Sequence, residues 1–133
     1  MRKLFTVCLT LALLATVALA KKYPLTAASI VPGARGDVDI SKDNNGNTKL
    51  KMKVQHLANA ANLTPPSAGY VIWLQGRGGE AENQGQLKVD RNLEASFETV
   101  TPLKSFDVFV TGEQDLKAKS PSGLEVLKAT IQQ

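Results

Sequence analysis

The chain is poor in the side chains on which most metal and redox chemistry depends. Among 133 residues it has one cysteine, one histidine and 5% aromatic residues. Cys8 lies inside an apolar run near the N-terminus, so residues 21–133 carry no thiol for a disulfide or a nucleophile. A metal site built on Met52 and His56 would lack the further His or Cys ligands of zinc and copper sites. We therefore expect no metal and no cofactor, and we expect His56 to be an exposed or edge-strand residue.

Sequence motifs of common enzymes are missing as well. The sequence contains no G-x-S-x-G, H-E-x-x-H or C-x-x-C. Glu80 with Glu82, and Glu113 with Asp115, form carboxylate pairs in or beside turns, where solvated charge is more usual than a glycosidase pair facing across a cleft. Residues 76–79 lack the spacing of a phosphate-binding loop and indicate a glycine-bearing hairpin turn. We therefore expect a protein that is not an enzyme.

The N-terminal 20 residues have the three parts of a secretory signal peptide. Arg2 and Lys3 are basic, residues 4–17 form an almost unbroken apolar run, and Ala18 and Ala20 are small residues at the positions that signal processing reads. An uncleaved membrane anchor is the alternative, because the run is close to the shortest length that spans a bilayer. We expect a bacterial protein that is periplasmic or secreted, with no transmembrane span after the signal is removed.

Cleavage is expected between Ala20 and Lys21, because alanines at 18 and 20 fit the small-residue positions of a signal peptidase site. Intact-mass measurement of the exported protein should give a chain that begins at Lys21. A species that retains residues 4–20 would contradict this prediction and would make the protein membrane-anchored.

Charge is nearly balanced once the first 20 residues are set aside. The whole chain has 16 Lys and Arg against 12 Asp and Glu, and Arg2 and Lys3 are two of the basic residues. The remaining balance of 14 to 12 gives no reason to expect nucleic acid as a partner. With 43% hydrophobic and 21% charged residues, the composition is typical of a single globular domain over residues 21–133.

Alternation of polar and apolar residues dominates residues 21–133 and predicts β-strands with one buried face. Five segments alternate, namely residues 37–40, 49–57, 86–90, 93–98 and 106–110. Residues 70–74 are apolar on both faces and predict a covered central strand, while residues 25–31 and 124–131 are weaker candidates for the first and last strands. Turn-forming residues separate these segments, and residues 58–68 indicate a crossover between sheets. The expected fold is all-β, an antiparallel, immunoglobulin-like sandwich of seven or eight strands after an N-terminal signal helix.

Large apolar side chains in these strands predict the hydrophobic core. Trp73 is flanked by apolar neighbours on the most hydrophobic strand, which favours a role as a core anchor over one as a ligand platform. The expected core residues are Tyr70, Trp73, Phe97, Phe106, Val108 and Val110.

Lys49, Lys51 and Lys53 share one face of a predicted strand and resemble a basic stripe for an anionic partner. A three-residue hairpin loop over residues 44–46, with Gly46 in the left-handed conformation, pairs Ile40 with Leu50 and keeps the apolar residues on one face. The same register sets Asp39 against Lys51 and Asp37 against Lys53. We therefore expect these opposed pairs to neutralise the lysines and to couple energetically, and we expect no retention on heparin or DNA.

A set of residues in the second half of the chain is similar to a known family. The set comprises Tyr70-x-x-Trp73-Leu74, Asn83-x-Gly85, Thr101-Pro102-Leu103, Phe106-x-Val108-x-Val110-Thr111-x-Glu113 and Pro121-Ser122-Gly123. It resembles the extracytoplasmic C-terminal domain of anti-sigma-K factors over roughly residues 57–128. In that family the domain is a sensor or interaction module joined by one transmembrane helix to a sigma-binding region. Because the present chain has neither that region nor a later span, the resemblance implies a free-standing exported copy of the domain.

Together these observations predict an exported, non-enzymatic β-sandwich that serves as an interaction or envelope-structural module, with an envelope or membrane protein as its partner. The alternative is an extracytoplasmic sensor or ligand-binding domain that acts through a membrane partner in a sigma/anti-sigma-type regulatory system. A periplasmic enzyme is the third reading, and an apolar cleft with converging polar groups would favour it.

Overall fold

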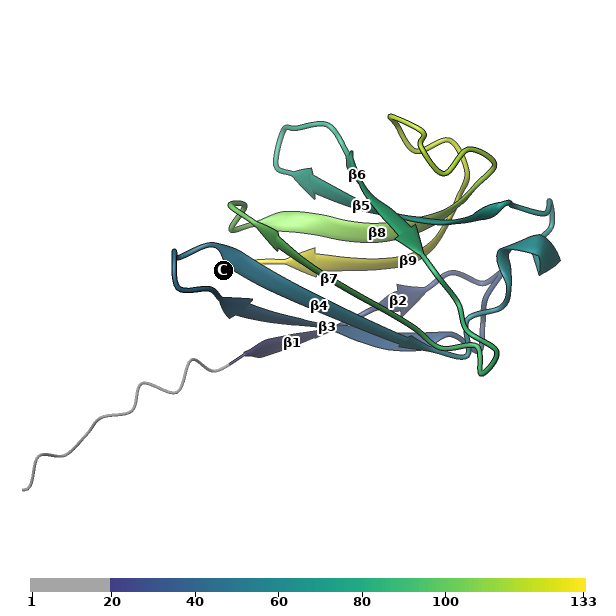
Figure 1. Ribbon diagram of the computed structural model, residues 1–133, viewed down its shortest axis with the longest axis horizontal. Coiled ribbons are helices and arrows are strands. Elements are labelled where there is room, and N and C mark those ends of the chain that lie inside the picture. The colour runs from purple at the N-terminus through teal and green to yellow at the C-terminus, as the bar shows by residue number, and fades with distance from the viewer. Residues whose placement is uncertain (1–19) are drawn as a thin grey trace, which may run out of the picture.

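The computed structural model describes residues 20–133, which form nine strands and one short 3₁₀ helix (Figure 1). The predicted signal helix lies outside these residues. Ala20 is exposed, and Lys21 is the first residue of strand β1. The elements are β1 (Lys21–Pro24), β2 (Thr26–Ala27), β3 (Arg35–Lys42), β4 (Thr48–Gln55), η1 (Ala60–Asn62), β5 (Gly69–Gly76), β6 (Glu82–Leu87), β7 (Ala95–Thr101), β8 (Phe106–Glu113) and β9 (Leu124–Ile131).

The fold is all-β and consists of two antiparallel sheets. One sheet has the order β1-β3-β4-β7 and the other the order β2-β9-β8-β5-β6. They form two layers that enclose one hydrophobic cluster, to which both contribute (Figure 1). The segment between β4 and β5 crosses from one sheet to the other and contains the short η1 helix, as predicted for residues 58–68. Within residues 20–133 no helix is long and apolar enough to span a membrane.

The N-terminal strand differs from the prediction, and this raises the number of strands above the expected seven or eight. Residues 25–31 do not form one strand. Instead β1 pairs with β3 in one sheet and β2 pairs with β9 in the other. The chain changes sheet at Leu25, whose side chain is buried and whose amide donates to the carbonyl of Gly36. Because Leu25 is anchored in the core, the strands on either side of it form edge strands of different sheets: β1 of one and β2 of the other.

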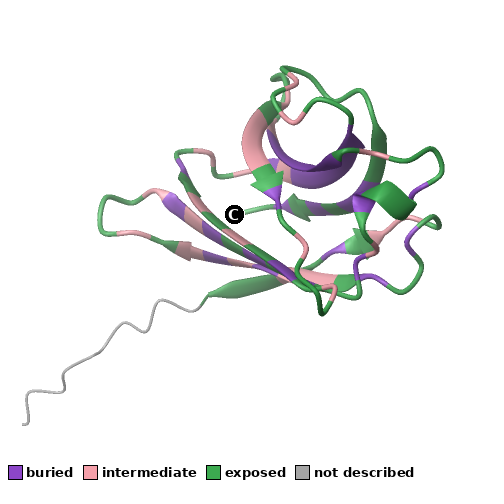
Figure 2. Ribbon diagram, turned by 45° about the vertical axis from the view of Figure 1, so that its right-hand side comes forward, coloured by how far each residue is buried: buried purple, intermediate pink, exposed green. Residues whose placement is uncertain are grey.

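The β3–β4 hairpin has the predicted loop and register. Ile40 lies opposite Leu50 and Val38 opposite Met52. Gly46 has a φ of 78°, and the amide of Asp43 donates to the carbonyl of Asn47 at 2.9 Å. Apolar side chains therefore share the inner face of both strands, and alternate positions of β4 are buried (Figure 2).

Asp39 lies opposite Lys51 and Asp37 opposite Lys53, as predicted, but the ion pair that Asp39 forms is with a different lysine. Asp39 instead lies 3.9 Å from the Nζ atom of Lys22 on β1. The hydrogen bond that closes the hairpin at Asp43 fixes the alternation of the ladder, so Asp39 and Lys51 form a hydrogen-bonded pair, in which side chains are farther apart. Lys22 and Asp39 form a non-hydrogen-bonded pair, which brings their side chains closer.

Lys49 is paired as well, across the other side of β4. Its Nζ atom lies 3.1 Å from Oε1 of Glu98 on β7, and this hydrogen bond lowers the pKa of Glu98. Both side chains are substantially exposed, so the contribution to stability is small and is screened by salt.

A double-mutant cycle on Lys49 and Glu98 is expected to give a larger coupling free energy than the same cycle on Asp39 and Lys51, because only the first pair is in contact. Urea unfolding of the four variants of each cycle measures both couplings. The Lys49/Glu98 coupling should fall as salt is added. Equal couplings in the two cycles, or a larger one for Asp39/Lys51, would contradict this prediction.

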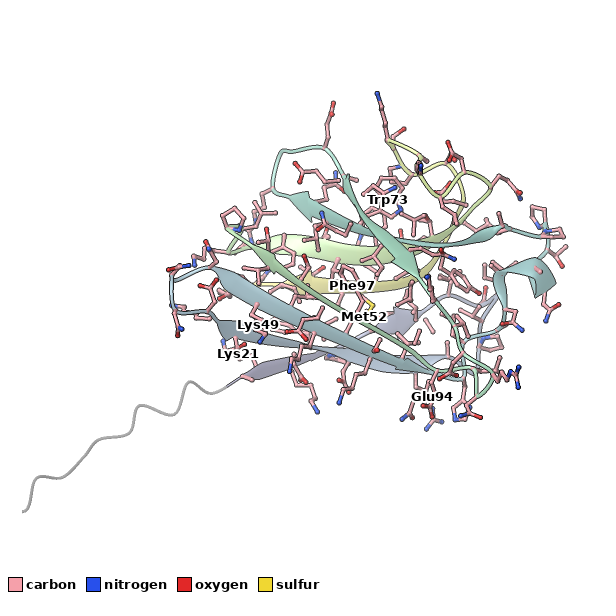
Figure 3. The ribbon with its side chains drawn as sticks, in the orientation of Figure 1. Lys21, Lys49, Met52, Trp73, Glu94 and Phe97 are labelled. Carbon is pink, nitrogen blue, oxygen red and sulfur yellow. The ribbon has the colours of Figure 1, made fainter. Side chains whose placement is uncertain are left out.

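Five of the six predicted core residues are buried. Tyr70, Phe106, Val108 and Val110 belong to the main cluster, and Trp73 belongs to a second one. Phe97 is only partly buried, which corrects the prediction for this residue. Its side chain points inward opposite Met52, but β7 is the last strand of its sheet and leaves the ring uncovered on one side (Figure 3).

Candidate functional site

Trp73 lies on the outer face of the β2-β9-β8-β5-β6 sheet. Along β5 the inner positions face the main core, while Val71 and Trp73 point the other way and pack with Phe109. Both faces of β5 are buried, as predicted, because Ala81, Leu116 and Ala118 cover the outer one. Trp73 is therefore an anchor, but for the loop between β8 and β9 rather than for the space between the sheets (Figure 3). We call residues 114–123 the β8–β9 loop.

A chain of buried hydrogen bonds runs from Trp73 to the base of the β8–β9 loop. Nε1 of Trp73 donates to Oγ1 of Thr111 at 2.8 Å, and the hydroxyl of Thr111 donates to Oε1 of Glu113 at 2.7 Å. Thr111 is 2% exposed and Trp73 is fully buried. The indole N–H, which would be costly to bury without a partner, is thus connected to the Glu113 carboxylate through the hydroxyl of Thr111.

Glu113 is the centre of this network. Its side chain is buried, with 1% of the residue exposed, and it accepts hydrogen bonds from the opposite end of the loop. The amides of Ser122 and Gly123 donate to Oε1 at 3.0 and 3.1 Å, and the hydroxyl of Ser122 donates to Oε2 at 2.7 Å. Burial raises the pKa of Glu113, but the hydrogen bonds from Thr111, Ser122 and Gly123 outweigh it and lower the pKa below its usual value.

The expectation that Glu113 carries solvated charge is therefore wrong. Its position at the end of β8, beside a turn, is one where carboxylates are usually hydrated. The donors that replace water here lie nine and ten residues farther along the chain, at Ser122 and Gly123 just before β9. The sequence signal was present as Thr111-x-Glu113 followed by Pro121-Ser122-Gly123, yet nothing in that spacing alone shows that the loop folds back.

Gly123 allows the loop to close this tightly. A Cβ atom at this position would lie 1.5 Å from the carbonyl oxygen of Gly112 and 3.4 Å from the carboxyl carbon of Glu113. Only glycine fits against the backbone of β8 here. The glycine thus places its own amide within reach of the carboxylate.

Asn83 holds the middle of the same loop from strand β6. Its Nδ2 atom donates to the carbonyls of Leu116 at 3.1 Å and Ala118 at 2.9 Å, while Oδ1 accepts from the amide of Gly85 at 2.8 Å. A β-bulge lies between Asn83 and Gly85, which has a φ of 117°. The bulge turns the Asn83 side chain toward the loop, as bulges commonly do when they redirect a side chain.

A shallow groove lies between β6 and the β8–β9 loop, and we call the exposed residues that line it the rim. Its charged members are Glu80 and Glu82 on one wall and Lys117 and Lys119 on the other. Apolar Leu116 forms part of the lining. The rim carries both signs of charge around a small apolar area, which is typical of protein-binding surfaces rather than of deep ligand pockets.

The buried carboxylate is not free for chemistry, because both of its oxygens accept hydrogen bonds from its own chain. His56 lies elsewhere, exposed, one residue after β4 and with a φ of 57°. Among residues 20–133 no three His, Cys, Asp or Glu side chains gather closely enough to hold a metal ion. The arrangement can fix the shape of a loop and present its outer surface.

Some of the residues quoted for the family resemblance meet around the β8–β9 loop, although they come from β5, β6, β8 and that loop. Others, such as Tyr70 and Phe106, belong to the main core. Trp73, Asn83, Thr111, Glu113 and Ser122 are joined through hydrogen bonds or shared contacts around that loop. No family model matches the chain, and no curated protein is significantly similar to it in sequence.

Proposed function

We propose that this chain is an exported, non-enzymatic β-sandwich of immunoglobulin-like type that serves as an interaction or envelope-structural module. Its partner is an envelope or membrane protein, and the binding surface is the rim formed by β6 and the β8–β9 loop. The single observation that carries the proposal is the Glu113 network, in which the buried side chains of Thr111 and Glu113 fix an exposed loop.

The connection order supports the immunoglobulin-like type. Strands β3, β4 and β7 lie in one sheet, and β9, β8, β5 and β6 lie in the other. In chain order this corresponds to an A-B-E sheet facing a G-F-C-C′ sheet, with crossovers after β4, β6 and β7. Loops at the ends and rims of such sandwiches are where binding residues commonly lie.

Burial supports a binding role over catalysis. The single buried carboxylate among residues 20–133 has its hydrogen-bonding capacity filled by its own chain, so it offers no general acid or base. The exposed carboxylates Glu80 and Glu82 lie on an open rim rather than in a site that excludes water.

Site-specific photo-crosslinking in the envelope tests the proposal. A photoreactive phenylalanine analogue placed at Gln84 or Lys117 should give a covalent adduct with one protein of the envelope. The matched control is the same analogue at Asn44, an exposed residue of the β3–β4 turn, which should give no such adduct. No adduct from the two rim positions, or the same adduct from Asn44, would contradict the proposal.

The alternative function is a sensor or ligand-binding domain that acts through a membrane partner in a sigma/anti-sigma-type system. The observation that favours it is that several of the residues quoted for the resemblance to anti-sigma-K factor domains hold the β8–β9 loop, namely Trp73, Asn83, Thr111, Glu113 and Ser122. The same crosslinks distinguish the two functions, because a membrane protein with a cytoplasmic sigma-binding region would support the sensor and an abundant envelope component would support the structural module.

A further inference from the structure

Strand β7 is a long and regular free edge. It is the last strand of the β1-β3-β4-β7 sheet, and its register with β4 is continuous from Ala95 to Thr101. The other sheet edges of residues 20–133 are short or irregular: β1 has four residues and ends in Pro24, β2 has two residues, and β6 is bulged at Gly85. Natural proteins shorten, bulge or place proline in exposed edges to prevent pairing with another chain, and β7 has none of these features.

The main chain of β7 presents unpaired groups along this edge. Because Asp43 and Asn47 form a hydrogen-bonded pair, the residues of β4 that bond to β3 are 49, 51 and 53, and those that bond to β7 are the even-numbered ones. Their partners on β7 are then the odd-numbered residues. The amides and carbonyls of Ser96, Glu98 and Val100 therefore point away from β4. No other described segment donates to these groups or accepts from them.

We propose that β7 pairs antiparallel with β7 of a second copy of this chain, which joins the two four-stranded sheets across a two-fold axis. Directly opposed residues of a sheet have their side chains on the same face, and successive residues of a strand alternate between faces. In a symmetric β7–β7 pair, one residue of β7 must therefore lie opposite its own counterpart, and the two-fold axis passes between these two copies of it. An axis through Glu98 would set the two Glu98 carboxylates opposite each other. An axis through Phe97 avoids this and pairs Ser96 with Glu98 of the second copy.

Phe97 favours the axis that passes through it. Its ring is partly buried beside the open edge of the sheet and lies opposite Met52 (Figure 3). In the proposed register the two Phe97 residues form a non-hydrogen-bonded pair, the arrangement that brings side chains closest. Each ring then covers the exposed side of the other, as cross-strand aromatic pairs do.

Charge on the outer face also fits this register. Within one chain Lys51 lies opposite Glu98, and Lys53 lies opposite Ser96. Across the joined sheets one row reads Lys51, Glu98, then Ser96 and Lys53 of the second copy. No two like charges are neighbours in that row.

This inference uses a different face from the β8–β9 loop and does not rest on the proposed function. An interface made of one strand from each copy is small, so we expect weak association that is visible at high protein concentration.

Disulfide trapping tests the register. In a Cys8→Ser background, one variant carries Ser96→Cys and another, with a distinguishing tag, carries Glu98→Cys. Directly opposed residues fall within disulfide reach, whereas diagonal neighbours are at its limit. Mild oxidation of the mixture should give mainly the 96–98 heterodisulfide. The proposed pairing would be overturned if the main product were a homodisulfide between two Glu98→Cys chains, or if no crosslinked product formed.

Sedimentation equilibrium tests the edge itself. Ser96→Pro removes an amide that points away from β4, so the fold is retained while one outward donor per copy is lost. The parent should dimerise with increasing concentration, and Ser96→Pro should dimerise at least about tenfold more weakly. Ser96→Thr keeps the amide and is the matched control, which should behave like the parent. A parent that stays monomeric at the highest concentration, or equal association of folded Ser96→Pro, would overturn the proposal.

Discussion

Replacing Trp73 with alanine is expected to destabilise the domain by about 3–5 kcal/mol, since a fully buried indole is removed and a cavity is left. This is a large part of the stability of a typical small domain. The substitution also leaves the hydroxyl of Thr111 without its indole donor and uncovers Leu116 and Ala118. Urea unfolding measures the loss of stability, and trypsin cleavage at Lys117 and Lys119 should become faster.

Trp73→Phe is the matched control, because it keeps an aromatic ring against Val71 and Phe109 but removes the Nε1 donor. Its loss of stability should be clearly smaller than that of Trp73→Ala. A Trp73→Ala variant that melts like the parent but no longer binds a partner would show that Trp73 is an exposed binding residue and would contradict its assignment as an anchor.

Replacing Glu113 with alanine is expected to cost roughly 2–4 kcal/mol. Thr111, which is buried, and the Ser122 and Gly123 amides would lose their common acceptor. Water can replace the carboxylate at the exposed end of the network but less readily at Thr111, which limits the loss. Thermal unfolding checks the magnitude.

Two further variants make the Glu113 result specific. Glu113→Gln keeps the shape of the side chain and one acceptor oxygen, so its loss should be intermediate. Glu82→Ala removes an exposed carboxylate from the rim and should change the stability by no more than about 0.5 kcal/mol. If Glu113→Ala were as stable as Glu82→Ala, the network would not hold the loop.

Much of the fold was predictable because strand register follows from local pattern. Ile40 and Leu50 must share a face, and a three-residue loop with Gly46 in the left-handed conformation achieves this, so the hairpin could be derived residue by residue. The Leu124–Ile131 strand was also predicted with the bounds that it has. The N-terminal segment was not, because a change of sheet at Leu25 depends on contacts with Gly36 rather than on periodicity.

The side-chain network was harder to predict than the strands. The apolar run over residues 70–74 predicts that Trp73 is buried, but it does not show which of the two apolar faces of the strand meets the main core. The burial of Glu113 depends on donors from Ser122 and Gly123, which only the folded β8–β9 loop brings near. The ion pair of Asp39 with Lys22 likewise depends on which strand closes the edge of the sheet.

The pH dependence of stability follows from the lowered pKa of Glu113. A carboxyl group whose pKa is lower in the folded state stabilises the fold above its unfolded value of about 4.3, and this contribution is lost as the pH falls through the folded-state pKa. The parent should therefore lose stability below about pH 5 more steeply than Glu113→Gln.

A carboxyl-carbon NMR titration of Glu113, followed together with the amide signals of Ser122 and Gly123, tests most directly whether this carboxylate fixes the loop. The expected result is a Glu113 pKa below about 4.3, with both amide signals moving at the same midpoint. A Glu113 pKa at or above that value, with the two amides unchanged, would mean that the carboxylate is free of the loop and would contradict the structural role on which the proposed interaction surface is built.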